Sequence, residues 1–308
     1  MPNDQVSNSS ASSRGQGADH PEQIPARGWK DIFVRAWTAS SEKNLSLVAG
    51  GVTYYIILAL FPAIAALVSI YGLVANPQTI EHEVNSMSGL LPGSTQSLIS
   101  SELHQLVSSS GGALSIGVVI GIIIALWSAS RGMSGMITAL DIAYGAEERR
   151  GFIRFNLTAI ALTVAMLIGG VIAIALVAGL PALLTGTGVS SKTKWFAYVV
   201  EWPILIVFVT AMMAALYRFA PNRDEPRWEW VSPGAIVGAV LWVIGSILFS
   251  VYVSHFGDYN KTYGSLGAII ALLTWLWLSA YVVLLGAEIN AQSERQTQAR
   301  PGNTAVRN

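Results

Sequence analysis

The sequence predicts an all-α, polytopic membrane protein with six transmembrane helices and both termini in the cytosol. Only 12% of its 308 residues are charged and 52% are hydrophobic, whereas a soluble domain carries about a quarter charged residues. Six stretches lack charge over most of a bilayer's thickness, and each approaches or exceeds the roughly 20 residues that cross a bilayer as a helix. They are residues 45–74, 113–130, 155–184, 195–217, 231–254 and 264–286.

The basic residues give the orientation of these spans. Fifteen of the eighteen Lys and Arg residues fall on one set of connecting segments, and the other set holds only Lys192, Lys194 and Lys261. Cytosolic loops of membrane proteins are enriched in Lys and Arg. This asymmetry predicts a cytosolic N-terminus and a cytosolic C-terminus, as in a protein of the bacterial inner membrane.

Two segments precede the first span. Residues 1–27 are rich in Ser, Gly, Asn and Gln, a composition typical of a disordered tail. Residues 28–44 differ, because apolar side chains such as Ile32, Phe33 and Trp37 recur at helical spacing. This pattern predicts an amphipathic helix that either lies on the inner leaflet or packs on the bundle.

The first span opens the membrane domain, residues 45–290. Pro62 lies in its middle, where it removes one backbone hydrogen bond and favours a kink. The polar side chains of Tyr54 and Tyr55 precede it and indicate a side that faces protein or a cavity; simple packing is the alternative. The loop after this span, residues 76–112, has two short apolar stripes around Pro92-Gly93, which predict a periplasmic helical hairpin.

Small residues and a polar end complete the element assignment. Gly117 and Gly121 lie four residues apart in the second span, as do Gly234 and Gly238 in the fifth. Such pairs allow two helices to approach closely in lipid. Residues 291–308 are polar and are expected to form a disordered C-terminal tail.

Ionisable and polar residues at membrane depth are the best candidates for a functional site, because burying a charge there is costly. We expect a substrate pathway to involve some of these, together with the residues of the first span. The candidates are Arg131, Asp141, Arg218, Glu288, Asn290, Tyr54, Tyr55, Pro62 and Glu201. Arg131, Asp141, Arg218 and Glu288 fall at the cytosolic ends of their helices and would cluster there. The alternative is structural, since an Arg near a helix end reaches the interface and an Arg–Glu pair can simply hold two helices together.

Composition argues against several classes of function. The chain has no Cys and four His without metal-ligand spacing, so we expect no metal or other cofactor. Nucleotide-binding and hydrolase motifs are absent from the sequence, and the spans leave no aqueous domain of ordinary catalytic size. We therefore expect a non-enzymatic protein whose partners are membrane lipids and envelope proteins rather than nucleic acids. The oligomeric state is not indicated.

Four blocks of sequence resemble the YihY/virulence factor BrkB family of bacterial inner-membrane proteins, over residues 28–292. They run from Ala49 to Pro62, from Trp127 to Tyr144, from Tyr217 to Ala235 and from Tyr263 to Asn290. This chain has Asp141 where Asn is expected in much of the family. The resemblance implies a six-helix membrane protein. An older family label, ribonuclease BN, conflicts with the missing cluster of His and carboxylate ligands.

The resemblance also implies a role at the cell envelope, because some family members are linked to serum resistance or to lipid export. Together with the kinked first helix and the inner charges, this favours a permease-like or lipid-translocating protein. A non-transporting scaffold that recruits envelope partners is the second hypothesis, and an intramembrane enzyme is the third. A polar groove lined by Arg131 and Glu288 would favour transport, whereas a solid, salt-bridged bundle would favour the scaffold.

Overall fold

Every secondary-structure element that the computed structural model describes is a helix, as the sequence predicts. The structure describes residues 18, 20–74, 101, 116–186, 191–223, 228–255 and 265–298. A 3-10 turn, η1 (Pro21–Gln23), precedes the short helix α2 (Ala26–Glu42). The long helices are α3 (Leu45–Val74), α6 (Ile116–Tyr144), α7 (Phe152–Gly186), α8 (Ser191–Phe219), α9 (Trp228–His255) and α11 (Ser265–Gln298).

Membrane-spanning capacity is found in all but one of these long helices. Five of them contain described stretches that are long and apolar enough to cross a bilayer. The corresponding apolar part of α8, Pro203–Phe219, is shorter, although the helix itself has 29 residues. A helix satisfies its own backbone hydrogen bonds, which is the condition for crossing lipid. The predicted class of multi-pass helical membrane protein is therefore confirmed. For the sixth predicted span, α8 is long enough to cross a bilayer, but its described apolar part is shorter than in the other five helices.

Left-handed residues end two of the helices sharply. Gly145, with φ of 67°, follows the last residue of α6. The amide of Ala146 donates to the Asp141 carbonyl (2.8 Å) and that of Gly145 to Ile142 (3.1 Å), which is the helix-ending Schellman arrangement. Asn44, with φ of 52°, follows the capping residue Lys43 and directly precedes α3. These turns set the positions of the residues that surround the buried charges described below.

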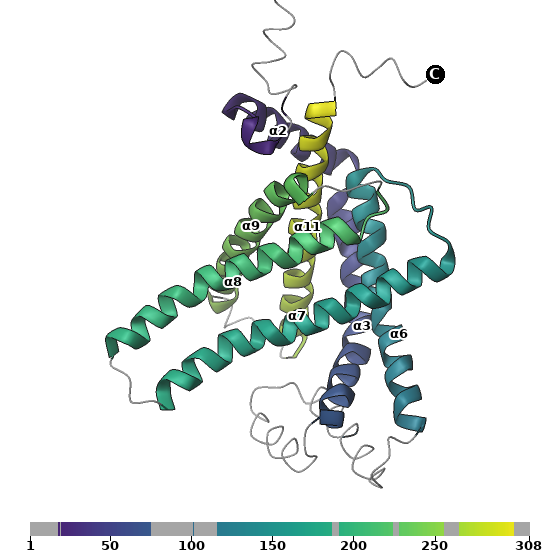
Figure 1. The fold of residues 1–308 in the computed structure, drawn as a ribbon, viewed down its shortest axis with the longest axis vertical. Helices are drawn as coiled ribbons and strands as arrows, with labels where there is room; N and C mark the ends of the chain where they lie inside the picture. Colours follow the sequence, from purple (N-terminus) through teal and green to yellow (C-terminus); the bar gives the residue numbers. More distant parts are fainter. Residues whose placement is uncertain are drawn as a thin grey trace, which may run out of the picture. The chain divides into compact units, whose positions relative to one another are not determined.

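The chain folds as two compact units. The first comprises Met1–Thr53, Met136–Arg150 and Ile172–Asn308, and the second comprises Tyr54–Gly135 and Gly151–Val171. In the first unit α9 lies between α8 and α11, and α2 lies across the end of α11 (Figure 1). Ile32 and Ala36 of α2 pack with Trp230 of α9 and Ile289 of α11. Helix α2 therefore packs on the bundle through this face, while its position relative to the inner leaflet stays a prediction.

Close backbone contact joins α9 to α11. A Cβ atom on Gly234 would collide with the Gly286 carbonyl oxygen, and one on Gly286 would lie 2.7 Å from the Gly234 carbonyl oxygen. Farther along, the Trp242 indole donates to Ser279 at 3.0 Å. The predicted close approach at Gly234 is thus confirmed, because only glycine leaves the backbones room to touch. Gly121, by contrast, faces open space.

In the second unit, α3 packs on α6 through Tyr55. A Cβ atom on Gly135 would lie 3.0 Å from the Tyr55 ring, and one on Gly132 would lie 3.0 Å from the Ala59 Cβ. Pro62 lies inside α3, which continues on both sides of it. Tyr55 is therefore partly a packing residue, although 47% of it stays exposed.

Two helices extend past the boundaries that composition predicts. Helix α2 begins at Ala26, within the segment expected to be a disordered tail, and α11 continues to Gln298, beyond the expected boundary at residue 290. The reason is polar burial, because Gln292, Ser293 and Gln296 are buried in the first unit. The predicted hairpin at 76–112 lies, apart from Ser101, outside the described residues.

Candidate functional site

A buried ion pair joins α2 to α11 at the end predicted to be cytosolic. The Glu288 side chain is 0% exposed, and one of its carboxylate oxygens accepts from Lys43 Nζ at 2.6 Å. The other oxygen accepts from Gln292 Nε2 at 2.8 Å. Lys43 also donates to the Ala143 carbonyl at 2.6 Å. Both oxygens of this buried carboxylate are therefore hydrogen-bonded, which is the condition for keeping a charge away from water.

The same face of α11 carries two further polar contacts to α2. Gln292 and Gln296 follow Glu288 at intervals of four residues, and such residues lie on one face of a helix. Arg35 of α2 donates to Gln296 at 2.6 Å and to Gln292 at 3.4 Å. Burial lowers the pKa of Arg35, while the charge of Asp31 acts in the opposite direction. This polar face explains why α11 continues past its apolar span.

Asn290 connects three helices. Its side-chain oxygen accepts from the Gly234 amide at 2.7 Å, and its nitrogen donates to the Val231 carbonyl at 3.0 Å and to the Tyr144 hydroxyl at 3.2 Å. Asn290 is fully buried. Its side chain therefore uses two donors and one acceptor to hold the ends of α6, α9 and α11 together, which gives this predicted candidate a positioning role.

Arg223, in the segment after α8, holds a second ion pair. It donates to both oxygens of Glu294 on α11, at 2.8 and 3.0 Å, and to the Tyr217 carbonyl at 3.1 Å. Its guanidinium lies 3.8 Å from the centre of the Tyr144 ring. A guanidinium over an aromatic face is attracted by the ring's electrons. The segment between α8 and α9 is therefore attached to both α6 and α11.

Asp141 lies in a third polar group, around the turn that follows α6. One of its oxygens accepts from the Asn222 amide at 2.8 Å. The other, Oδ2, is buried without a hydrogen bond among the described atoms and lies 4.0 Å from Arg150. Arg150 itself donates to Glu148 and to the Ala220 carbonyl. The Asp141 carboxylate is thus close to a cation that other groups already hold.

Glu148 is the partner that holds Arg150. The backbone amide and two guanidinium nitrogens of Arg150 donate to the Glu148 carboxylate at 2.5 to 3.1 Å. Burial acts to raise the pKa of Glu148, but the hydrogen bonds and charge of Arg150 outweigh it and leave the pKa below its ordinary value. Glu148 therefore stays ionised at neutral pH and neutralises the cation beside Asp141.

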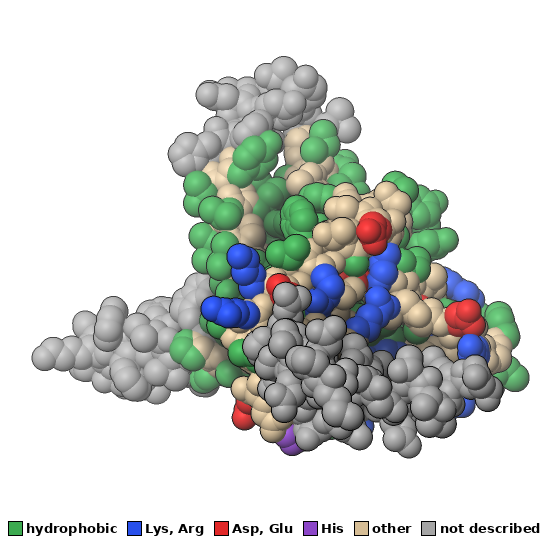
Figure 2. Space-filling view, turned by 90° about the horizontal axis from the view of Figure 1, so that it is seen from above, with side chains coloured by type: hydrophobic (Ala, Val, Ile, Leu, Met, Phe, Trp, Pro, Cys, Tyr) green, Lys and Arg blue, Asp and Glu red, His purple; other side chains and the backbone are tan. Residues whose placement is uncertain are grey.

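These three groups form one assembly, called here the inner cluster. Figure 2 shows Lys and Arg side chains gathered with acidic ones on the face seen from above. The cluster ties α2, α6, α11 and the loops after α6 and α8 together within the first unit. Its charged and hub residues are Lys43, Asp141, Tyr144, Arg150, Arg223, Glu288, Asn290 and Glu294.

The other predicted site residues lie elsewhere. Arg218 stacks on Trp228 at 4.6 Å. Arg131 belongs to the second unit, where its guanidinium lies 4.5 Å from the Trp127 ring. Glu288 already has Lys43 as its ion-pair partner, so the cavity predicted for Arg131 and Glu288 stays a prediction. Tyr54 and Tyr55 are exposed and Pro62 is half-buried in the second unit; the side chain of Glu201 lies outside the described residues.

Several cluster residues are not among the candidates that the sequence suggests. In the sequence, Lys43, Arg150 and Arg223 contribute only to the asymmetry of basic residues between the two sides of the membrane. Glu294 falls in the C-terminal segment that is expected to be disordered. The available signal is the spacing of Glu288, Gln292 and Gln296, a polar stripe on one helical face that needs polar partners. Arg35 on α2 and Lys43, which caps α2, supply these partners among the described residues.

Comparison with known proteins agrees with the sequence blocks. YfkH of Bacillus subtilis (strain 168), named as a ribonuclease-like protein, is 35% identical over 268 residues, which cover 85% of this chain and 93% of YfkH. The UPF0761 membrane protein IL2447 of Idiomarina loihiensis is 26% identical, covering 84% of this chain and 89% of that protein. The UPF0761 membrane protein NTHI0384 of Haemophilus influenzae is also 26% identical, covering 84% and 94%. No solved structure matches this chain.

The family model described as Virulence factor BrkB matches residues 36–308. The match includes every residue of the inner cluster. The chain is therefore a multi-pass bacterial membrane protein that belongs to the BrkB family.

Proposed function

We propose that the protein is a permease-like or lipid-translocating protein of the bacterial inner membrane, and that the inner cluster closes its pathway at the cytosolic end. The observation that carries this proposal is the ion pair between Lys43 and the fully buried Glu288. It holds α2, the helix outside the membrane domain, against α11, a candidate span.

An ion pair is suited to a contact that closes and opens reversibly. Replacing a buried ion pair by well-packed apolar residues is often neutral or even stabilising. A contact needed only for adhesion would therefore be served at least as well by leucine and methionine. Charged groups can instead exchange each other for water or for a polar ligand when the helices separate, which lets the same surface alternate between two states.

The backbone supplies a joint beside this contact. Lys43 caps α2, and Asn44, with φ of 52°, is the only residue before α3 begins. Hinges are a few residues at the ends of elements that absorb the change in backbone angle. Release of Lys43 from Glu288, together with loss of the Arg35 contacts to Gln292 and Gln296, would let α2 rotate about this residue while α3 stays in the membrane.

A non-transporting scaffold is the second candidate. One observation favours it: both oxygens of Glu288 are satisfied, as in a bundle that stays closed. Ribonuclease activity is not part of the proposal. Glu148, Glu288 and Glu294 are each paired with a Lys or an Arg, an arrangement that neutralises carboxylates rather than gathering them around a metal ion.

A double apolar variant separates the two candidates. Lys43→Met with Glu288→Leu keeps α2 attached by packing but removes the charges that allow it to separate. In proteoliposomes, transbilayer movement of fluorescent phospholipids would be followed by quenching from outside. Transport predicts that the double variant folds as well as wild type and loses most of the activity. Wild-type activity in the folded double variant would contradict the proposal.

Opening can also be measured without knowing the substrate. The chain has no Cys, so a single introduced Cys is labelled without background. Gln292→Cys places the thiol at a buried position, and Glu42→Cys at an exposed one. Opening predicts slow labelling of the buried thiol by a water-soluble maleimide, abolished in the double apolar background. The exposed thiol reacts equally in both backgrounds.

A further inference from the structure

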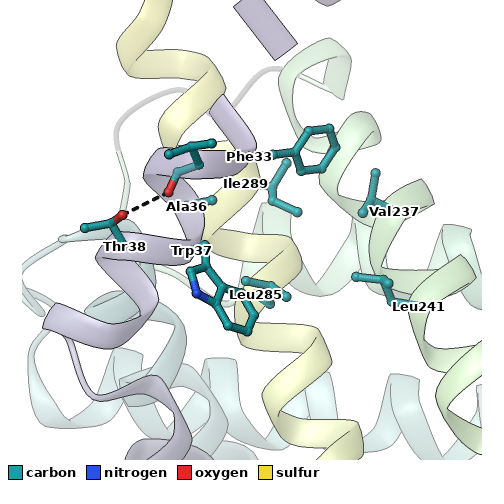
Figure 3. A pocket seen from close by; sticks show the side chains of 9 residues that line it. Phe33, Ala36, Trp37, Thr38, Val237, Leu241, Leu285 and Ile289 are labelled. Atoms are coloured by element: carbon teal, nitrogen blue, oxygen red, sulfur yellow. Dashed lines mark hydrogen bonds between the residues drawn. The ribbon is translucent and has the colours of Figure 1, made fainter. Parts of the chain in front are cut away.

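An apolar groove lies between α2 and the paired helices α9 and α11, separate from the charged residues of the inner cluster. Its volume is about 440 Å³, within the roughly 300–1,000 Å³ typical of sites for small organic ligands. Figure 3 shows its lining. The side chains that matter here are Phe33 and Trp37 on α2, Val237 and Leu241 on α9, and Leu285 on α11.

The α2 wall of the groove is unusually exposed for its residue types. Trp37 is 62% exposed, Val34 57% and Phe33 42%. The adjoining apolar residues Ile32 and Ala36 are buried against the bundle, and Ala36 also lines the groove. An amphipathic helix with Trp and Phe on a free face lies at the boundary between headgroups and acyl chains.

The opposite wall belongs to two candidate membrane spans. Val237 and Leu241 belong to the candidate span Trp228–Val253, and Leu285 belongs to Ile269–Gln296. With both termini predicted to be cytosolic, α9 is expected to enter the membrane from the cytosolic side, which places Leu241 deeper than Val237. The groove therefore opens from the inner leaflet's headgroup region into its hydrocarbon.

Lys30 is a cationic residue next to the α2 wall of the groove. Lys30 precedes Phe33 by three residues and Val34 by four, and residues at these intervals share a helix face. Lys30 is exposed and has no hydrogen bond or ion pair with any described residue. Lys30 therefore lies one helical turn before the α2 wall of the groove, on the same helix face.

We propose that this groove holds a phospholipid of the inner leaflet, with one acyl chain along Trp37, Leu241 and Leu285 and an anionic headgroup at Lys30. The charge complementarity and the position of α9 and α11 in the bilayer argue for this occupant. The chain's own N-terminal residues 1–17 are mostly Ser, Gly, Asn and Gln, so they offer no segment that would fill an apolar groove.

Photolabelling tests the acyl-chain part. Wild-type protein in phosphatidylethanolamine vesicles would receive a trace of phosphatidylglycerol with a diazirine in one acyl chain, and labelled residues would be mapped by mass spectrometry. The expected label lies on Phe33, Trp37, Leu241 or Leu285. Labelling spread evenly over exposed span residues such as Leu248 would overturn the site, as would cross-linking to a second copy of the chain.

Two matched variants test the groove: one places a larger side chain in it, and the other places the same side chain outside it. Val237→Phe projects into it, whereas Val240→Phe, three residues along the same helix, is on an exposed surface outside its lining. Val237→Phe is expected to lower groove labelling about tenfold, and Val240→Phe to leave it unchanged. Equal labelling of the two folded variants would contradict the proposal.

The headgroup part has its own control. Lys30→Glu is expected to lower labelling by phosphatidylglycerol about fivefold, and to leave labelling by phosphatidylcholine with the same chain unchanged. Arg154→Glu, another exposed cation near the cytosolic boundary, should change neither. Equal wild-type labelling by both lipids would overturn the headgroup assignment. A bound lipid suits a permease and a scaffold alike, so this test and the transport assay can fail independently.

Discussion

Removing Lys43 is the sharpest test of the inner cluster. Glu288 is 0% exposed and Lys43 Nζ is 2.6 Å from its carboxylate. Lys43→Met would leave that carboxylate with only the Gln292 hydrogen bond, at 2.8 Å. Breaking a buried ion pair by removing one partner costs about 3–5 kcal/mol, because the remaining charge is neither paired nor hydrated.

The magnitude separates this change from ordinary surface substitutions. Lys30 is on the exposed face of the same helix, so Lys30→Met should alter the free energy of unfolding by less than about 0.5 kcal/mol. The double variant Lys43→Met, Glu288→Leu removes the stranded charge and should recover most of the loss. The two single substitutions are therefore expected to be strongly non-additive.

Thermal stability in detergent is the suitable assay. Because the chain has no Cys, thiol-reactive dyes give no signal, and loss of the monodisperse peak on size-exclusion chromatography after heating is measured instead. Lys43→Met should lower the melting temperature by on the order of 10 °C. A melting temperature equal to that of Lys30→Met would refute the reasoning, since it would show that the pair contributes nothing to stability.

Three further predictions follow from individual contacts. Gly286→Ala should destabilise the protein by about 1–3 kcal/mol in thermal melts, because its Cβ would meet backbone and side-chain atoms of two other helices; Gly170→Ala, which faces open space, should not. Asp141→Asn should change the melting temperature little, because an amide oxygen can accept the same backbone bond and the buried Oδ2 lacks a hydrogen bond; a large loss would show that the charge facing Arg150 is needed. The pKa of Glu148 is below its ordinary value in the fold, so its stabilising contribution is present above the unfolded pKa of about 4.3 and is lost as pH falls through the folded pKa. Glu148→Gln should therefore reduce the loss of melting temperature at acid pH. An unchanged pH profile of the melting temperature in this variant would contradict the prediction.

The sequence by itself determined the class of the protein and the positions of its helices along the chain. Those properties are local. A run of apolar residues enters the bilayer wherever it is placed in the chain, and a helix satisfies its own backbone there. The polar stripe of Glu288, Gln292 and Gln296 is also visible in the sequence. Because its hydropathy is low, the sequence predicts that the membrane domain ends near residue 290, whereas α11 continues to Gln298.

Only the tertiary structure decided which charges meet. Asp141, Glu288 and Asn290 are visible as candidates, yet Glu288 pairs with Lys43, nearly 250 residues earlier in the chain, and no local pattern indicates this pairing. Hydropathy is a property of one segment, whereas an ion pair depends on which faces of two helices come together. For the same reason the sequence shows α2 as amphipathic, but packing decides that Ile32 is buried while Phe33 and Trp37 remain largely exposed.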